Sequence, residues 1–181
     1  MIIFPKDFEM QMVELLDGEF DDFMASLQEK PLTSIRLNKY KRGHELILHN
    51  PIPWTENGYY LKDRPKFTLD PYFHAGHYYV QESSSMILDY ILKKLTLKPD
   101  ALILDICAAP GGKSTILADH FNSDSIIHSH EVHSKRAEIL KQNMIRWGHS
   151  NSIVSTGNPE KIYSSGIKYD LILIDAPCSG E

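Results

Sequence analysis

One short stretch, an apolar run followed by a turn of small residues, constrains the fold of this chain more than any other. Residues 101–104 are apolar, Asp105 ends the run, and small residues fill most of positions 107–112. Residues 114–121 then read as a helix. A buried strand, a tight turn and a helix N-terminus are typical of an open α/β sheet, where ligands bind at the carboxyl ends of strands. The turn is therefore a candidate ligand site, because small residues let the backbone approach a ligand and the helix start offers free N–H groups.

A Gly-Gly-Lys-Ser turn suits two kinds of nucleotide ligand. A phosphate-binding P-loop has the pattern Gly-x4-Gly-Lys-Ser/Thr, but Cys107 stands where its first glycine belongs. Pro110 also removes one N–H from the phosphate nest. In a turn that binds S-adenosylmethionine (SAM), an acidic residue ends the strand and small residues follow at alternate positions, as Asp105, Cys107, Ala109 and Gly111 do. We favour the SAM interpretation; a plain strand–turn–helix connection without a ligand is the alternative.

The motif Asp-Ile-Cys-Ala-Ala-Pro-Gly-Gly-Lys-Ser at residues 105–114 closely resembles the cofactor motif of the Nol1/Nop2/Sun family of RNA 5-methylcytosine methyltransferases, whose bacterial RsmB/RsmF-like members act on ribosomal RNA. The likeness extends to residues 35–38, 78–86 and 135–148. The resemblance implies SAM as cofactor and RNA as partner. It also implies an α/β fold: a truncated Rossmann-like class I methyltransferase domain with the first four strands, preceded by a small α+β N-terminal region.

Hydrophobic periodicity places the elements of this fold. We expect an N-terminal α+β region at residues 1–70, which contacts RNA, and a truncated SAM-binding methyltransferase domain at residues 71–181. The N-terminal region should hold two amphipathic helices, with Phe8, Met12 and Leu15 on the inner face of the first, followed by a strand. In the second region the apolar stripe Ile87, Leu88, Ile91, Leu92 and Leu95 should pack in the core. The expected helices cover residues 5–16, 19–30 and 134–147, and the expected strands residues 33–38, 101–105, 125–131, 151–156 and 169–175.

Basic and aromatic residues interleave between positions 36 and 67, although the net charge of the whole chain is −5. Such a mixture can hold phosphates and stack bases. A solvated surface over a small core is the alternative, and the resemblance favours RNA contact. The residues concerned are Arg36, Lys39, Lys41, Arg42, Lys62, Arg64 and Lys66, with Tyr40, Trp54, Tyr59, Tyr60 and Phe67.

A second acid follows the glycine turn at the distance expected for ribose recognition. Glu131 stands 20 residues after Gly111, at the end of the next predicted strand, where a carboxylate accepts protons from ribose hydroxyls; a surface acid is the alternative. The resemblance places Asn158 where the family has an acid that contacts the adenine amino group, and an amide carbonyl accepts the same hydrogen bond. The predicted cofactor-binding residues are Cys107, Ala108, Ala109, Pro110, Gly111, Gly112, Lys113, Glu131, Asn158 and Asp175.

The fourth predicted strand ends in Asp175-Ala176-Pro177-Cys178, which resembles enzymes that methylate carbon 5 of a pyrimidine. Carbon 5 of cytosine becomes nucleophilic only after a thiolate adds to carbon 6. The resemblance implies that Asp175 contacts the target base, that Cys178 helps to release the product, and that the main nucleophile belongs to a later motif beyond residue 181. Cys178 as the nucleophile, as in DNA 5-methylcytosine enzymes, is an open alternative. A non-catalytic SAM- or RNA-binding remnant is the alternative to an enzyme.

The remaining features of the sequence concern the cellular compartment, metal binding, membrane spans and self-association. The two cysteines fit no disulfide or metal spacing, which suits a reducing cytoplasm, and we expect no metal although His128, His130 and His133 lie close together. No apolar run reaches membrane-spanning length. The chain reads as a truncated protein, so the apolar strand at residues 169–174 should become an exposed sheet edge through which copies of the chain associate.

Overall fold

The computed structural model describes residues 3–41, 43–121 and 123–176, in two compact units of residues 1–32 and 33–181. The first unit is a helical pair in which Phe8 and Phe23 meet with ring centroids 6.4 Å apart. The helices confirm the sequence prediction, but Leu15 is 71% exposed, so its predicted inward position is wrong. Two short helices have too little facing surface to cover it. The elements are α1 (Lys6–Leu16), η1 (Asp17–Glu19) and α2 (Phe20–Gln28).

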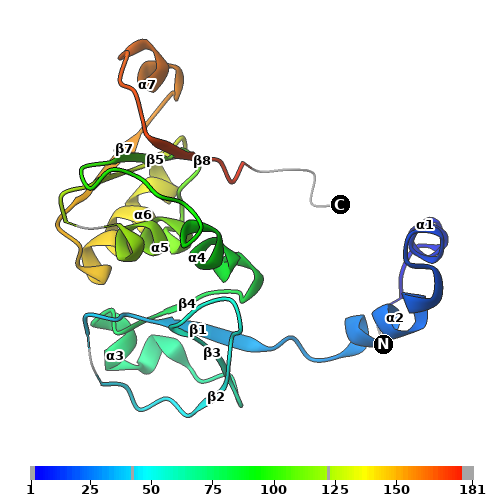
Figure 1. Ribbon diagram of the computed structural model, residues 1–181. Helices are drawn as coiled ribbons and strands as arrows, with labels where there is room; N and C mark the ends of the chain where they lie inside the picture. Colours follow the sequence, from blue (N-terminus) through cyan, green and yellow to red (C-terminus); the bar gives the residue numbers. More distant parts are fainter. Residues whose placement is uncertain (1–2, 42, 122, 177–181) are drawn as a thin grey trace. The chain divides into compact units, whose positions relative to one another are not determined.

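The second unit begins with a small antiparallel sheet in the order β2-β3-β1-β4 (Figure 1). One face of this sheet buries Ile35, Leu61 and Tyr78 against Phe67 and the aromatic side chains of α3. Only the first of its strands was predicted, because the others have three or four residues each and lie among turn residues and charges. The elements are β1 (Thr33–Leu37), β2 (Leu48–Pro51), β3 (Gly58–Leu61), η2 (Phe67–Leu69), α3 (Pro71–His74) and β4 (Tyr78–Val80).

The pairing of β4 bears on the predicted division of the chain at residue 70. β4 pairs with β1, with Tyr79 opposite Arg36, so the small sheet takes one strand from beyond that position. The division into an RNA-contacting region and a SAM-binding domain stays a prediction.

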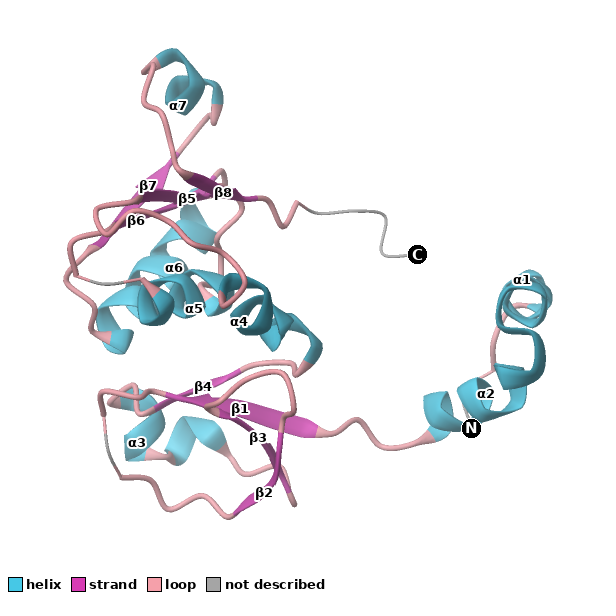
Figure 2. Cartoon of the chain, viewed as in Figure 1, coloured by secondary structure: helices cyan, strands magenta, loops and turns pink. Residues whose placement is uncertain are grey.

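A parallel sheet in the order β7-β6-β5-β8 forms the rest of the unit. Figure 2 shows α4, α5 and α6 on one face of this sheet and α7 on the other. The four strands and their order confirm the predicted α/β fold, whereas α7 was not predicted. The elements are η3 (Ser84–Met86), α4 (Ile87–Leu92), β5 (Leu102–Asp105), α5 (Gly112–His120), β6 (Ile126–Glu131), α6 (Ser134–Trp147), β7 (Ser152–Thr156), α7 (Glu160–Ser164) and β8 (Leu171–Leu173).

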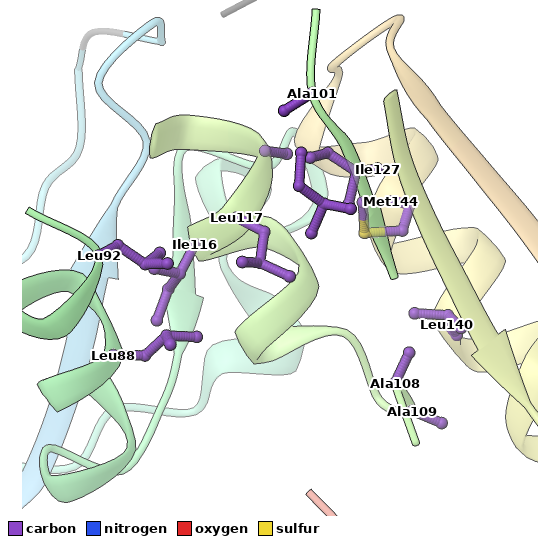
Figure 3. Close-up of a cluster of buried hydrophobic side chains, with 12 residues drawn as sticks. Leu88, Leu92, Ala101, Ala108, Ala109, Ile116, Leu117, Ile127, Leu140 and Met144 are labelled. Carbon is purple, nitrogen blue, oxygen red and sulfur yellow. The ribbon is translucent and has the colours of Figure 1, made fainter. Parts of the chain in front are cut away.

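The core of this unit lies between the parallel sheet and the helices on its covered face (Figure 3). Ile103 and Ile127 from the sheet, Leu117 from α5 and Leu140 from α6 are all fully buried. Burying such a side chain stabilises the fold by about 1.5–3 kcal/mol.

The apolar stripe predicted around α4 is only partly correct. Leu88 and Leu92 are buried, but Ile87, Ile91 and Leu95 are 42–49% exposed. α4 ends at Leu92 and turns one narrow face to the core, so the outer members of the stripe stay in contact with solvent.

The bounds predicted for α6 are confirmed. Gly148 follows the last helical residue with a φ of 97°, in the left-handed region where glycine ends helices at little cost. Its N–H donates to the carbonyl of Met144 over 3.1 Å.

Strand β8 pairs with β5 and with no other strand in the described part of the chain. Ile172 at its centre is 51% exposed. The strand therefore has the open edge on which the predicted self-association depends, and that association stays a prediction.

Across residues 3–41, 43–121 and 123–176, none of the helices has the length and apolar character needed to cross a membrane.

Candidate functional site

The turn between β5 and α5 lies at the carboxyl edge of the parallel sheet. Gly111 has a φ of 111° and immediately precedes α5. A Cβ atom at this position would lie 3.2 Å from Leu140 Cδ1, so both the backbone conformation and the space favour glycine. The N–H of Ala108 donates to the carbonyl of His130 over 2.9 Å, which holds the turn beside the end of β6.

Three side chains from two other elements bind the carbonyls of this turn. Arg136 of α6 donates to the carbonyl of Ala109 over 2.8 Å. The carbonyl of Pro110 accepts from Asn143 of α6 at 2.7 Å and from the hydroxyl of Tyr79 of β4 at 3.1 Å. The turn is thus held by α6 on one side and by the small sheet on the other.

Asp105, which ends β5, is a buried and incompletely satisfied acid. Its side chain is 1% exposed, and its Oδ2 accepts from the Ser114 hydroxyl at 2.7 Å. Its Oδ1 is buried and makes no hydrogen bond of good geometry with the described residues, although the backbone N–H of Cys107 lies close enough to lower the pKa of this carboxyl. Burial raises the pKa of Asp105 to about 6, against the opposing effects of Ser114, Lys113 and Cys107. A buried acceptor without a well-formed hydrogen bond, next to a glycine turn, marks a candidate ligand site.

A cavity of about 200 Å³ opens over the turn. Seven of the residues predicted from the sequence line it: Cys107, Ala108, Ala109, Pro110, Gly112, Lys113 and Asp175. Typical small-molecule sites measure about 300–1,000 Å³. A nucleoside ligand held by all the predicted residues must therefore extend out of the cavity, along the carboxyl ends of β6 and β7.

The predicted residues Gly111, Glu131 and Asn158 are not among those that line the cavity. Glu131, at the end of β6, is 4% exposed; its Oε1 accepts from the N–H of His133 at 3.0 Å and its Oε2 lies 3.5 Å from Arg136 Nη1. Asn158, after β7, is exposed, and its Oδ1 accepts from the N–H of Glu160 at 2.9 Å. Each of these oxygens has a second lone pair, so the predicted roles toward ribose and adenine stay compatible with the structure.

The residues predicted for catalysis are only partly described. Asp175 forms an ion pair with Lys113, which brings the predicted base-contacting acid to the cofactor turn. Cys178 lies outside the described residues. Cys107 is half-buried, and burial together with the nearby acid Asp105 raises the pKa of its thiol. Cys107 is therefore a thiol at neutral pH.

Sequence reasoning missed the wall of the cavity that faces the turn. Tyr79, Gln81, Glu82 and Ser85 line this wall, and they belong to the stretch 78–86 that resembles the family without having been given a role. At the start of η3, Ser83 makes no capping hydrogen bond, and Glu82 accepts from the N–H of Ser85 at 3.1 Å.

The predicted RNA-contacting residues separate into two groups. The side chain of Arg36 is 4% exposed, so its assignment to an RNA surface is wrong. Lys41 donates to the carbonyls of Ala75 and Arg146, which makes it a cap for α3 and α6. Arg42 lies outside the described residues. Exposed cations with no such structural role are Lys62, Arg64 and Lys66.

The histidine pair of β6 makes hydrogen bonds. His128 contacts the hydroxyls of Tyr169 at 2.6 Å and Ser155 at 2.7 Å, and His130 contacts Ser155 at 2.8 Å. Across the described ranges, no group of three or more His, Cys, Asp or Glu residues is placed to hold a metal.

A parallel sheet with the order third, second, first, fourth strand, together with the acid and glycine turn after the first strand, defines a Rossmann-like methyltransferase domain. Comparison with known families is more specific. The profile for the N-terminal domain of the 16S rRNA methyltransferase RsmF matches residues 4–83, and the profile for the 16S rRNA methyltransferases RsmB/F matches residues 92–181. The chain belongs to the RsmB/F family of rRNA methyltransferases.

Individual relatives agree with this assignment. Ribosomal RNA small subunit methyltransferase F of Escherichia coli O127:H6 is 32% identical over 197 residues, covering 99% of this chain and 41% of that protein. A methyltransferase homolog protein from Pyrococcus horikoshii superposes with a TM-score of 0.81 at 27% identity, over 98% of this chain and 60% of that one. The crystal structure of PH0851 superposes with a TM-score of 0.82 at 26% identity, over 96% of this chain and 41% of that one. The chain thus spans about two-fifths of the length of the curated relatives.

Proposed function

We propose that this chain forms the cofactor-binding part of a SAM-dependent methyltransferase that modifies carbon 5 of cytosine in ribosomal RNA. The observation that carries the proposal is Asp105, a buried acid at the end of β5, directly before the glycine turn, whose Oδ1 makes no well-formed hydrogen bond. SAM supplies an electrophilic methyl group and carries an ammonium group and ribose hydroxyls as hydrogen-bond donors. Buried acceptors at the ends of β5 and β6 match those donors.

Residues along the carboxyl edge of the sheet would each bind a different part of the cofactor or of the RNA. The turn 107–113 would hold the amino-acid end of the cofactor, Glu131 the ribose hydroxyls and Asn158 the adenine amino group. Asp175, beside Lys113, would meet the target base where the cavity opens, and Cys178 would follow it. The exposed cations Lys62, Arg64 and Lys66 would contact RNA phosphates, which attract positive charge independently of sequence.

Calorimetry with SAM tests the cofactor site. We expect Glu131→Ala to weaken SAM binding by about 1–3 kcal/mol, because the ribose hydroxyls lose a charged acceptor. Glu131→Gln, which keeps the size and one acceptor oxygen, should lose less. Glu138→Ala removes an exposed acid of α6 and serves as the control, with an unchanged dissociation constant. Equal affinities for the wild type and Glu131→Ala would remove the ribose assignment.

The reaction itself is tested on the whole protein, with tritiated-methyl SAM and undermethylated small-subunit rRNA. We expect the label in 5-methylcytosine, and at least about 100-fold slower transfer in Asp175→Ala, since a group that stabilises charge on the reacting base is lost. Lys168→Ala, a change in a lysine remote from the turn in sequence, should leave the rate unchanged. Label on an exocyclic nitrogen or on a ribose oxygen would contradict the carbon-5 assignment.

A further inference from the structure

Arg36 is the most heavily bonded charged side chain of the small sheet, although the methyltransferase chemistry gives it no role. It lies in β1 and is 3% exposed. Its guanidinium carbon lies 4.6 Å from the ring centroid of Trp147, so it stacks on the last residue of α6. Burying a guanidinium is costly unless each face and N–H has a partner, and burial indeed lowers its pKa although Asp119 opposes this effect.

The guanidinium reaches both ends of α5. Nη1 pairs with Asp119 in the last turn of the helix, and Nη2 donates to the hydroxyl of Thr115. Nη2 also lies 3.4 Å from the carbonyl of Gly112, the first residue of α5. Thr115 in turn donates to that same carbonyl over 2.9 Å. Arg36 therefore binds the turn of helix that directly follows the cofactor turn.

The fourth hydrogen-bonding partner of Arg36 lies on the opposite wall of the cavity. Its Nε donates to Gln81 Oε1 over 3.1 Å, and Gln81 Nε2 donates to the Ser85 hydroxyl over 3.1 Å. The space between the two walls is small at this point, because a Cβ atom on Gly112 would lie 3.2 Å from Gln81 Nε2. One side chain thus sets the separation of the glycine turn and Gln81.

We propose that Arg36 is a positioning residue of the cofactor site: it holds the first turn of α5 and the side chain of Gln81 at the separation that the cofactor requires. This inference rests on the proposed function. It gives the small sheet a part in cofactor binding in addition to any contact with RNA. The planar fork of arginine spreads its donors over three nitrogens and so reaches Gln81, Thr115 and Asp119 at once, whereas the donors of lysine are all on one compact ammonium.

The test compares Arg36→Met and Arg36→Lys with the wild type, at a temperature well below the melting point of every variant. We expect the SAM dissociation constant to rise at least about 10-fold in Arg36→Met, with partial recovery in Arg36→Lys. Hydrogen exchange without ligand gives an independent readout, and we expect amides of residues 107–115 to exchange at least about 10-fold faster in Arg36→Met.

Asn38→Ala is the matched control. Asn38 is also 3% exposed and also joins the small sheet to the parallel-sheet part, by a hydrogen bond to the carbonyl of Trp147. It also donates to the carbonyl of Gly76 within the small-sheet part, and no hydrogen bond joins it to α5. The Asn38→Ala variant should have a lower melting temperature than the wild type. Its SAM affinity and the amide hydrogen exchange of residues 107–115 should each change less than about 2-fold.

Three outcomes separate the inference from the function on which it rests. Arg36→Met with wild-type affinity and exchange would overturn the positioning role alone. Equal losses in Arg36→Met and Asn38→Ala would overturn it too, since the effect would be general loosening. A wild-type chain that does not bind SAM would contradict the proposed function, and the exchange of residues 107–115 would then decide whether Arg36 holds the turn.

Discussion

Gly76→Ala is expected to lower the free energy of unfolding by about 3–5 kcal/mol, because overpacking and left-handed backbone strain add at one position. Gly76 has a φ of 74°, and a Cβ atom there would lie 2.1 Å from the carbonyl oxygen of Arg146 and 2.8 Å from its carbonyl carbon. Both neighbours are backbone atoms of α6, so no side-chain rotation relieves the clash. The midpoint of urea unfolding, with the slope checked for constancy, measures the loss.

Gly43→Ala separates the two causes. Gly43 has a φ of 95°, but the nearest atom to its Cβ position is Tyr72 Cε1 at 3.6 Å, an ordinary contact. The free energy of unfolding of this variant should fall by the backbone strain alone, about 1–2 kcal/mol. Equal losses in the two variants would mean that the loop at Gly76 yields to the added methyl group, and that the small sheet is not tightly held against α6 at this point.

The close approach at Gly76 illustrates why the small sheet was the harder part to predict. The parallel sheet could be predicted because two of its strands lie in continuous apolar runs, at residues 101–104 and 171–174, and because Gly148 marks the end of α6. The small sheet has strands of three to five residues, and its partners come from distant parts of the chain. Its register is fixed by tertiary contacts that no local pattern reveals.

Arg36 shows the same limit for a single residue. Alternation in a strand predicts which residues share a face, and it correctly separated Ile35 from Arg36. The interpretation of the polar face as an RNA surface was wrong because that face packs against α5. A buried arginine needs Asp119, Thr115 and Gln81 around it, and these residues come from more than 40 positions away.

For the candidate site, the sequence sufficed where one segment of chain carries the information. The turn 107–113 lies at the end of β5 as expected, because the acid, the small residues and the helix start are contiguous. The opposite wall, with Tyr79 and Gln81, comes from the small sheet and could be found only through its position in space. Contiguous motifs were thus predictable, and the complementary wall was not.

The second large effect concerns the pH dependence of stability through Asp105. Burial raises its pKa from the ordinary 3.8 to about 6, so the folded state binds this proton more tightly than the unfolded state does. Stability from this group is therefore complete below pH 3.8 and is lost as the pH rises through 6. A difference of about 2 pKa units corresponds to about 3 kcal/mol.

Asp105→Asn should abolish this loss. Urea unfolding at pH 4 and pH 7 measures the free energy of both proteins, and we expect the wild type to lose about 2 kcal/mol relative to the variant between the two values. The full difference is not reached because part of the loss has already occurred at pH 4, and all other titrations cancel in the comparison. Asp170→Asn is the control. The N–H of Leu102 lowers the pKa of Asp170 below the ordinary 3.8, so its stability change lies mostly below pH 4, and the wild type should change little relative to that variant between pH 4 and pH 7.

A pH profile of Asp105→Asn parallel to that of the wild type would show that Asp105 ionises as an ordinary acid, with solvent reaching its Oδ1. The expected profile has a further consequence for the site. At neutral pH the folded chain retains a buried carboxylate that destabilises it, with one oxygen lacking a well-formed hydrogen bond. A ligand that donates a hydrogen bond to that oxygen favours the ionised form, so it should lower the pKa of Asp105 and recover part of the lost stability. Repeating the pH 7 measurement with SAM tests this: the wild type should gain more stability from SAM than Asp105→Asn does.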